Sequence, residues 1–242
     1  MGFFKDGLQR RVPKKEFLLS LFEAFSQRLV AGLSRKDGPL LLVIAGHNGA
    51  GKSTCYRKYL REALEPHLEN HIDPDAIERK VRAEWRGDLL SDDDFSLMAR
   101  EEAKRLRSMY LENGIAFSME TVLSDPVGDK VRFLQEAVHR GFFVVLLAVG
   151  LGSPEKSRER VALRVSRGGH NVLPEKIVGR YPRVVRNLKH AVGLVSLALV
   201  VDNSDDNLDE DGDAYFAFAL FANGQPVETA ENIPHWWQVE SG

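Results

Sequence analysis

The stretch of sequence that decides the fold is Leu40-Leu-Leu-Val-Ile-Ala-Gly46-His-Asn-Gly-Ala-Gly-Lys52-Ser53-Thr54. It opens with an unbroken apolar run, which is typical of a strand buried on both faces of a parallel sheet. From Gly46 to Ser53 it matches the Walker A spacing of Gly, four residues, Gly, Lys and then Ser or Thr. Because this motif lies between an apolar strand and a helix, we predict a phosphate-binding loop.

The residue types of this loop suit an anion. Glycine is required where the backbone curls around a phosphate, and the backbone N–H groups and the helix N-terminus then point at it. We assign ATP binding to the whole loop, which comprises Gly46, His47, Asn48, Gly49, Ala50, Gly51, Lys52, Ser53 and Thr54. Lys52 would bridge the β- and γ-phosphates, and the Ser53 hydroxyl would ligate Mg²⁺. His47 and Asn48 are interpreted as loop-filling residues rather than catalysts.

Outward from the loop, helical and strand patterns alternate along the chain. Helices are expected over 14–33, 53–64, from Asp73-Pro74-Asp75 onward, and over 92–111, 126–140, 153–167 and 174–190. Strands are expected over 40–45, up to Ile72, and over 115–119, 142–149, 194–201 and 214–222, the last at a sheet edge. The pattern predicts a P-loop NTPase or kinase-like α/β fold, with a doubly wound, mostly parallel sheet flanked by helices and a helical, arginine-rich lid.

The domain organisation is simple. The sequence has no internal repeat and no Gly-, Ser- or Pro-rich linker that would divide it. We expect a single P-loop kinase domain over 39–222, a helical lead-in over 1–38 packed on the core, and a C-terminal tail over 223–242 held by Trp236 and Trp237. The amphipathic helix of the lead-in has an alternative role as a partner-binding helix.

Composition excludes several classes of protein. The net charge of -2 leaves no excess of positive charge for a nucleic-acid backbone, so we expect no nucleic-acid partner. The one cysteine, Cys55, cannot form an intramolecular disulfide and is interpreted as buried packing. No segment reaches the ~18 consecutive apolar residues of a membrane span, and the start does not resemble a signal peptide. We therefore expect a soluble, cytoplasmic protein without membrane association.

The choice among P-loop proteins depends on features outside the loop. The guanine-reading segment Asn-Lys-x-Asp and the transporter signature Leu-Ser-Gly-Gly-Gln are both missing from the sequence, which argues against a GTPase and a transporter ATPase. Asp202, which follows a Walker B-like strand, is interpreted as a strand-end residue. Seven arginines flank Gly168-Gly169, namely Arg158, Arg160, Arg164, Arg167, Arg180, Arg183 and Arg186. Cations on a mobile lid favour a small-molecule kinase.

Together these segments resemble the zeta toxin family over roughly residues 40–204. The matching segments are Gly46 to Thr54, Ile72-Asp-Pro-Asp75, Phe117-Ser-Met-Glu-Thr-Val-Leu-Ser124, Arg164-Val-Ser-Arg-Gly-Gly-His170 through Arg180-Tyr-Pro-Arg183, and Val201-Asp-Asn-Ser204. The resemblance implies a kinase that uses ATP and Mg²⁺ to phosphorylate the 3′-hydroxyl of the sugar in UDP-N-acetylglucosamine or a related UDP-sugar. It also admits an antitoxin protein as a partner.

The resemblance also implies roles for single residues. Asp75 would be the general base, although the helix dipole favours an acid in a first turn anyway. Glu120 and Thr121 would hold the sugar substrate, and Arg164 and Arg180 would clamp the γ-phosphate. Asp73 is interpreted as the helix N-cap, and weaker candidates are Glu102, Arg160 and His170.

Two other functions remain open from the residues. One is a P-loop kinase of another small molecule, such as a nucleotide, a cofactor or an amino acid. The other is a nucleotide-gated switch, in which slow ATP turnover changes a partner surface such as the 14–33 helix. Release of ADP that depends on an acceptor would separate a kinase from a switch.

Overall fold

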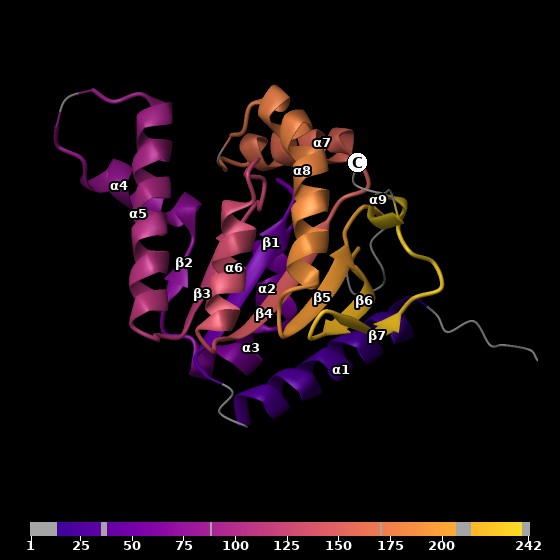
Figure 1. Ribbon diagram of the computed structural model, residues 1–242. Helices are drawn as coiled ribbons and strands as arrows, with labels where there is room; N and C mark the ends of the chain where they lie inside the picture. Colours follow the sequence, from indigo (N-terminus) through magenta and orange to yellow (C-terminus); the bar gives the residue numbers. More distant parts are fainter. Residues whose placement is uncertain (1–13, 35–37, 88, 170, 207–213, 239–242) are drawn as a thin grey trace, which may run out of the picture.

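The computed structural model describes residues 14–34, 38–87, 89–169, 171–206 and 214–238. Their strands form one seven-stranded sheet in the order β2-β3-β1-β4-β5-β6-β7 (Figure 1). The strands are β1 Leu40–Gly46, β2 His71–Ile72, β3 Phe117–Thr121, β4 Phe143–Gly150, β5 Leu197–Asp202, β6 Phe216–Ala222 and β7 Gln225–Thr229. β1 to β5 pair in parallel, whereas β6 and β7 are antiparallel. The expected mostly parallel sheet is confirmed.

Helices cover both faces of this sheet. They are α1 Lys14–Ser34, α2 Lys52–Tyr59, α3 Arg61–Leu64, the 3-10 turn Glu65–His67, α4 Pro74–Glu84, α5 Asp92–Glu112, α6 Asp129–His139, α7 Pro154–Ser166, α8 Pro174–Val192 and α9 His235–Gln238. α1, α2 and α3 contribute to the core on one face, and α5, α6 and α8 to the core on the other. The fold is therefore a doubly wound α/β arrangement. No helix of the described residues is both long and apolar enough to cross a membrane.

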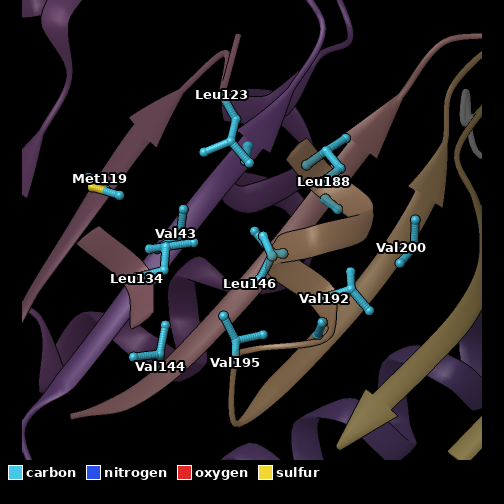
Figure 2. Close-up of a cluster of buried hydrophobic side chains, with 14 of the residues drawn as sticks. Val43, Met119, Leu123, Leu134, Val144, Leu146, Leu188, Val192, Val195 and Val200 are labelled. Atoms are coloured by element: carbon cyan, nitrogen blue, oxygen red, sulfur yellow. The ribbon is translucent and has the colours of Figure 1, made fainter. Parts of the chain in front are cut away.

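The strand before the phosphate loop is buried on both sides, as its apolar run predicts. Alternate residues point to opposite faces of the sheet, so Val43 joins one core cluster and Ile44 the other. Figure 2 shows Val43 beside Leu134 of α6, and Leu188 of α8 over the neighbouring strands. This burial fixes the position of the loop that follows β1.

Some boundaries differ from the prediction, and each has a local cause. The expected 53–64 helix is interrupted at Leu60, where the backbone leaves helical geometry. α6 begins at Asp129 rather than Pro126, because Gly128 adopts a left-handed conformation with a φ of 72°. β3 begins at Phe117, later than expected, and extends to Thr121.

The 214–222 segment is not at the sheet edge. Asn223 and Gly224 both have positive φ, which suits a tight hairpin turn, and the chain returns as β7 along the outer side of β6. The segment expected as a tail therefore begins with the edge strand of the same sheet. Cys55 is buried, as expected.

The parallel strands bring their carboxyl ends to a common edge. Ala45 of β1 is in register with Thr121 of β3, and Gly46 with Val149 of β4. In α/β sheets, ligands bind in the crevice outside these ends. α7 and the first turns of α8 lie beyond this edge, at the top of Figure 1.

Candidate active site

The phosphate loop needs its glycines for two separate reasons. Gly46, Gly49 and Gly51 have φ values of 148°, 74° and 78°, which side chains rarely adopt. A Cβ at Gly46 would lie 1.8 Å from the carbonyl oxygen of Val149, and one at Gly51 would lie 2.5 Å from the hydroxyl oxygen of Tyr215. The carbonyl of Val149 and the hydroxyl of Tyr215 therefore leave no room for a side chain at Gly46 and Gly51.

The start of α2 offers its backbone donors to a ligand. Its N-cap is Gly51, which provides no side-chain hydrogen bond to the first turn. Lys52 Nζ donates to the carbonyls of Gly46, at 3.3 Å, and His47, at 3.0 Å, so the ammonium lies across the loop. Burial lowers the pKa of Lys52, while the carboxylates of Glu120 and Asp75 act in the opposite direction.

The acids predicted from the sequence lie on two neighbouring elements beside this loop. Glu120 ends β3, and its Oε2 accepts a hydrogen bond of 2.7 Å from the Ser53 hydroxyl. Asp75 lies in the first turn of α4, which Asp73 caps by accepting the Asp75 N–H at 2.9 Å. The interpretation of Asp73 as the N-cap is therefore confirmed.

The two arginines expected at the γ-phosphate lie in different surroundings. Arg164 of α7 lies 4.0 Å from an Asp75 oxygen, and its charge also lowers the pKa of Lys52. Burial lowers the pKa of Arg180 on α8, and the neighbouring charges of Arg100 and Arg183 lower it further. The structure thus brings together Lys52, Ser53, Asp75, Glu120 and Arg164, and places Arg180 in a separate basic group.

The family is evident from comparison with known proteins. The sequence model of the zeta toxin family matches residues 26–211. The chain belongs to the zeta toxin family. A Haemophilus influenzae protein of uncharacterised function is 29% identical over 136 residues, which span 56% of this chain and 88% of that protein.

Solved structures share the fold of this zeta toxin family member. The native AvrRxo1-ORF1:ORF2 complex contains a chain with a TM-score of 0.53 and 16% identity, covering 93% of this chain and 71% of that one. The same complex solved with ATP gives a TM-score of 0.51 and 16% identity, over 89% and 68%. The PezAT toxin-antitoxin system of Streptococcus pneumoniae gives 0.48 and 17% identity, over 78% and 80%.

The other residues predicted as part of the site in this zeta toxin family member form contacts away from Lys52 and Ser53, where the structure describes them. Thr121 Oγ1 accepts the Leu123 N–H at 3.2 Å and so holds the turn after β3. Arg160 forms an ion pair of 2.9 Å with Asp206, and Glu102 forms one of 2.7 Å with Arg105. His170 lies outside the described residues.

The residues that hold the backbone carbonyls of the loop could not be predicted from the sequence. The loop carbonyls accept hydrogen bonds from three side chains: Ser157 to Asn48 at 2.6 Å, Asn203 to Ala50 at 2.9 Å, and Tyr215 to Gly51 at 2.8 Å. Because these carbonyls are held inward, the first-turn N–H groups of α2 remain for a ligand, whereas the Ala50 N–H donates to the His47 carbonyl at 3.2 Å. These donors follow no motif and lie far from the loop in sequence, so no pattern could have identified them.

His47 is more than a loop-filling residue. Its imidazole is 2% exposed, accepts the Leu151 N–H at Nδ1 over 3.2 Å, and stacks on Tyr181 with ring centroids 4.4 Å apart. The edge of Trp236 lies 5.8 Å away. Burial lowers the pKa of His47 to about 3, so the ring is neutral.

Asp202 is occupied by structural contacts, in agreement with its interpretation as a strand-end residue. Its Oδ1 accepts from Trp236 Nε1 at 2.7 Å and from the Ser204 hydroxyl. The described residues contain no group of three or more His, Cys, Asp or Glu side chains arranged to hold a metal. The Ser53 hydroxyl and the Glu120 carboxylate are oxygen donors of the kind that Mg²⁺ prefers, and Mg²⁺ commonly completes its shell with water and phosphate oxygens.

Proposed function

We propose that this chain is an ATP-dependent phosphotransferase, which transfers the γ-phosphate of ATP to a hydroxyl of a UDP-sugar such as UDP-N-acetylglucosamine. The observation that carries the proposal is the convergence of Lys52 and Ser53 with Asp75, Glu120 and Arg164 at the carboxyl edge of the sheet. Membership of the zeta toxin family supports a phosphotransferase built on a P-loop. The complex solved with ATP agrees with ATP as the phosphate donor.

The loop from Gly46 to Thr54 would bind the phosphates of ATP. Its inward carbonyls would leave the first-turn N–H groups of α2 to face the β-phosphate. Lys52 would exchange its two loop carbonyl partners for phosphate oxygens. Ser53 would hold Mg²⁺, which when bound neutralises charge on the phosphate oxygens.

The transfer itself follows from the placement of the acids and Arg164. Asp75 would accept the proton of the acceptor hydroxyl while the oxygen of that hydroxyl bonds to the γ-phosphorus. The bond from that phosphorus to the β–γ bridging oxygen breaks, and ADP leaves. Arg164 would stabilise the shifting charge, and Glu120 and Thr121 would orient the acceptor. Arg180 stays a prediction as the second clamp, because its charged neighbours in the structure are Arg100 and Arg183.

The alternatives of a kinase for another small molecule and of a nucleotide-gated switch use the same loop. We favour the UDP-sugar because the matching segments after β3 and on α7 and α8 resemble the zeta toxins throughout. Family membership also supports an antitoxin as a protein partner and the cytoplasm as the location.

The direct test is to incubate the purified protein with ATP, Mg²⁺ and a panel of UDP-sugars, nucleosides and amino acids. Mass spectrometry should show one added phosphate on a UDP-sugar, and Lys52→Ala should abolish that product. Phosphate on a different acceptor would support the other kinase reading. Only ADP and free phosphate with every acceptor would contradict the proposal and favour the switch.

A further inference from the structure

Two aromatic side chains from different elements bond the backbone of the same residue. His47 Nδ1 in the phosphate loop accepts the Leu151 N–H at 3.2 Å, and the Tyr181 hydroxyl on α8 donates to the Leu151 carbonyl at 2.7 Å. The His47 and Tyr181 rings also stack on each other, with centroids 4.4 Å apart and an angle of 21° between their planes. We call these three residues the interlock. It joins the phosphate loop, α8 and the connection from β4 to α7.

The groups of the interlock have the protonation states that these bonds require. Burial lowers the pKa of His47 to about 3, so Nδ1 is an acceptor at neutral pH. Burial raises the pKa of Tyr181, so its hydroxyl remains a donor. Leu151 is itself buried, and buried backbone groups need such partners. Because Leu151 lies two residues before Ser153, the N-cap of α7, the interlock fixes the point from which α7 begins.

α7 also packs directly on the phosphate loop. Ser157 is 1% exposed, and its hydroxyl donates to the Asn48 carbonyl at 2.6 Å. A Cβ at Gly49 would lie 2.9 Å from the Cβ of Arg160 and 3.2 Å from the backbone nitrogen of Val161. So close an approach leaves no gap between the loop and the first two turns of α7.

The face of α7 that contacts the loop continues to Arg164. Ser157, Val161 and Arg164 are spaced i, i+4 and i+7, which places them on one face of a helix. Arg164 lies 4.0 Å from an Asp75 oxygen, and its charge lowers the pKa of Lys52. Arg164 therefore reaches the site from a helix that the phosphate loop itself holds.

We propose that Tyr181 and Ser157 are positioning residues, which hold α7 on the phosphate loop so that Arg164 keeps one place in the site. The catalytic consequence rests on the proposed phosphotransferase function. A cation that is fixed in advance stabilises the transferring phosphoryl group without reorganisation at the moment of reaction. A lid that swings as a whole would instead bring Arg164 to the site in each catalytic cycle.

A first test measures the placement of α7 and needs no turnover. Spin labels at Lys58→Cys on α2 and Leu163→Cys on α7 report the distance between α7 and the helix that follows the loop. Both positions are exposed, whereas the natural Cys55 is buried. We expect one narrow distance distribution, with the same mean distance when ATP and Mg²⁺ are added, and a broader distribution in the Tyr181→Phe/Ser157→Ala double variant.

Two outcomes of the distance measurement would overturn the proposal. One is a distribution that is broad without these two substitutions, or whose mean ATP shortens. The other is a double variant whose distribution is as narrow as before. Because the labels report on α7 directly, this result does not depend on whether the protein is a kinase.

A second test uses the kinase reaction. Tyr181→Phe and Ser157→Ala should each lower kcat by on the order of 10-fold and leave KM for ATP unchanged, because Lys52 still binds the phosphates. Tyr110→Phe on α5 and Ser166→Ala at the exposed end of α7 remove the same hydroxyl groups elsewhere and should alter neither constant. A raised KM for ATP with kcat unchanged would show that these contacts only shape the loop, and would overturn the proposal.

A double-variant comparison separates positioning of Arg164 from a general loss of stability. If Tyr181 acts through Arg164, Tyr181→Phe should change kcat by less than about twofold in an Arg164→Ala background. A further loss of about 10-fold in that background would overturn the proposal. Failure of the wild type to phosphorylate any acceptor would count against the proposed function, whereas the distance measurement still decides how α7 is held.

Discussion

The buried imidazole of His47 makes the stability of the protein depend on pH. Its folded pKa of about 3 lies below the ordinary value of 6.5 because the imidazole is buried. Between these values the unfolded state binds more protons than the folded state, so the free energy of unfolding falls as pH decreases. The stability associated with the neutral ring is complete above 6.5 and is lost progressively below it.

We expect this dependence in urea unfolding measured from neutral pH to about pH 5. In the wild type, His47 should contribute a slope of up to ~1.4 kcal/mol per pH unit below its unfolded pKa. His47→Gln should lower stability at neutral pH and flatten the slope, whereas His67→Gln, at an exposed position, should keep the wild-type slope. A wild-type slope in His47→Gln would contradict this account.

The sequence could identify single residues only where a motif names them. Lys52 and Ser53 follow from the Walker spacing, and Asp75 and Glu120 from the family resemblance. The structure brings these side chains together, although their roles remain predictions. Ser157, Asn203 and Tyr215 could not be found because common residue types far apart in sequence carry no local signal of their contact with the loop.

At the scale of the element, α4 places the proposed general base Asp75 in its first turn, and its N-cap can be tested. Asp73→Ala should lower the free energy of unfolding by ~1 kcal/mol, because the Asp75 N–H loses its acceptor. Asp73→Asn should retain most of this stability, since asparagine caps equally well. Urea titration of the three proteins measures the effect, and equal stability of the alanine and asparagine variants would argue against the cap.

Most elements could be predicted because their apolar periods are long and clear. β1, β4 and α8 match the expected segments closely, since each contributes a continuous buried face. β7 was missed because its residues are largely exposed at the sheet edge and include Pro226, which weakens any strand pattern. The start of α6 was placed too early because only the left-handed Gly128 defines it.

At the scale of the whole molecule, α9, the last described helix, packs beneath the phosphate loop, which lies in the first quarter of the chain. Trp236 of α9 is 3% exposed, and its indole fills the space above Gly150, where a Cβ would come within 2.0 Å of the ring. The indole Nε1 donates a hydrogen bond to Asp202, and the ring packs edge to face with His47. The C-terminal segment thus completes the core beneath the phosphate loop.

Removing this ring should therefore destabilise the molecule strongly. Trp236→Ala should lower the free energy of unfolding by ~3–5 kcal/mol, through the cavity and the loss of the indole hydrogen bond to Asp202. Trp85→Ala, at a position 37% exposed, should cost clearly less. Thermal or urea unfolding of both variants provides the comparison, and similar losses would show that Trp236 is not a core residue.

The central claim is that Asp75 and the phosphate loop form one phosphotransferase site. The most direct measurement is to quantify ADP and phosphorylated acceptor together, for the wild type and Asp75→Asn, with the acceptor identified by mass spectrometry. We predict one phosphorylated acceptor per ADP in the wild type, and a kcat lowered by roughly 10²- to 10⁴-fold in Asp75→Asn with ATP affinity retained. A fully active Asp75→Asn protein, or ADP formed without any phosphorylated acceptor, would contradict the claim.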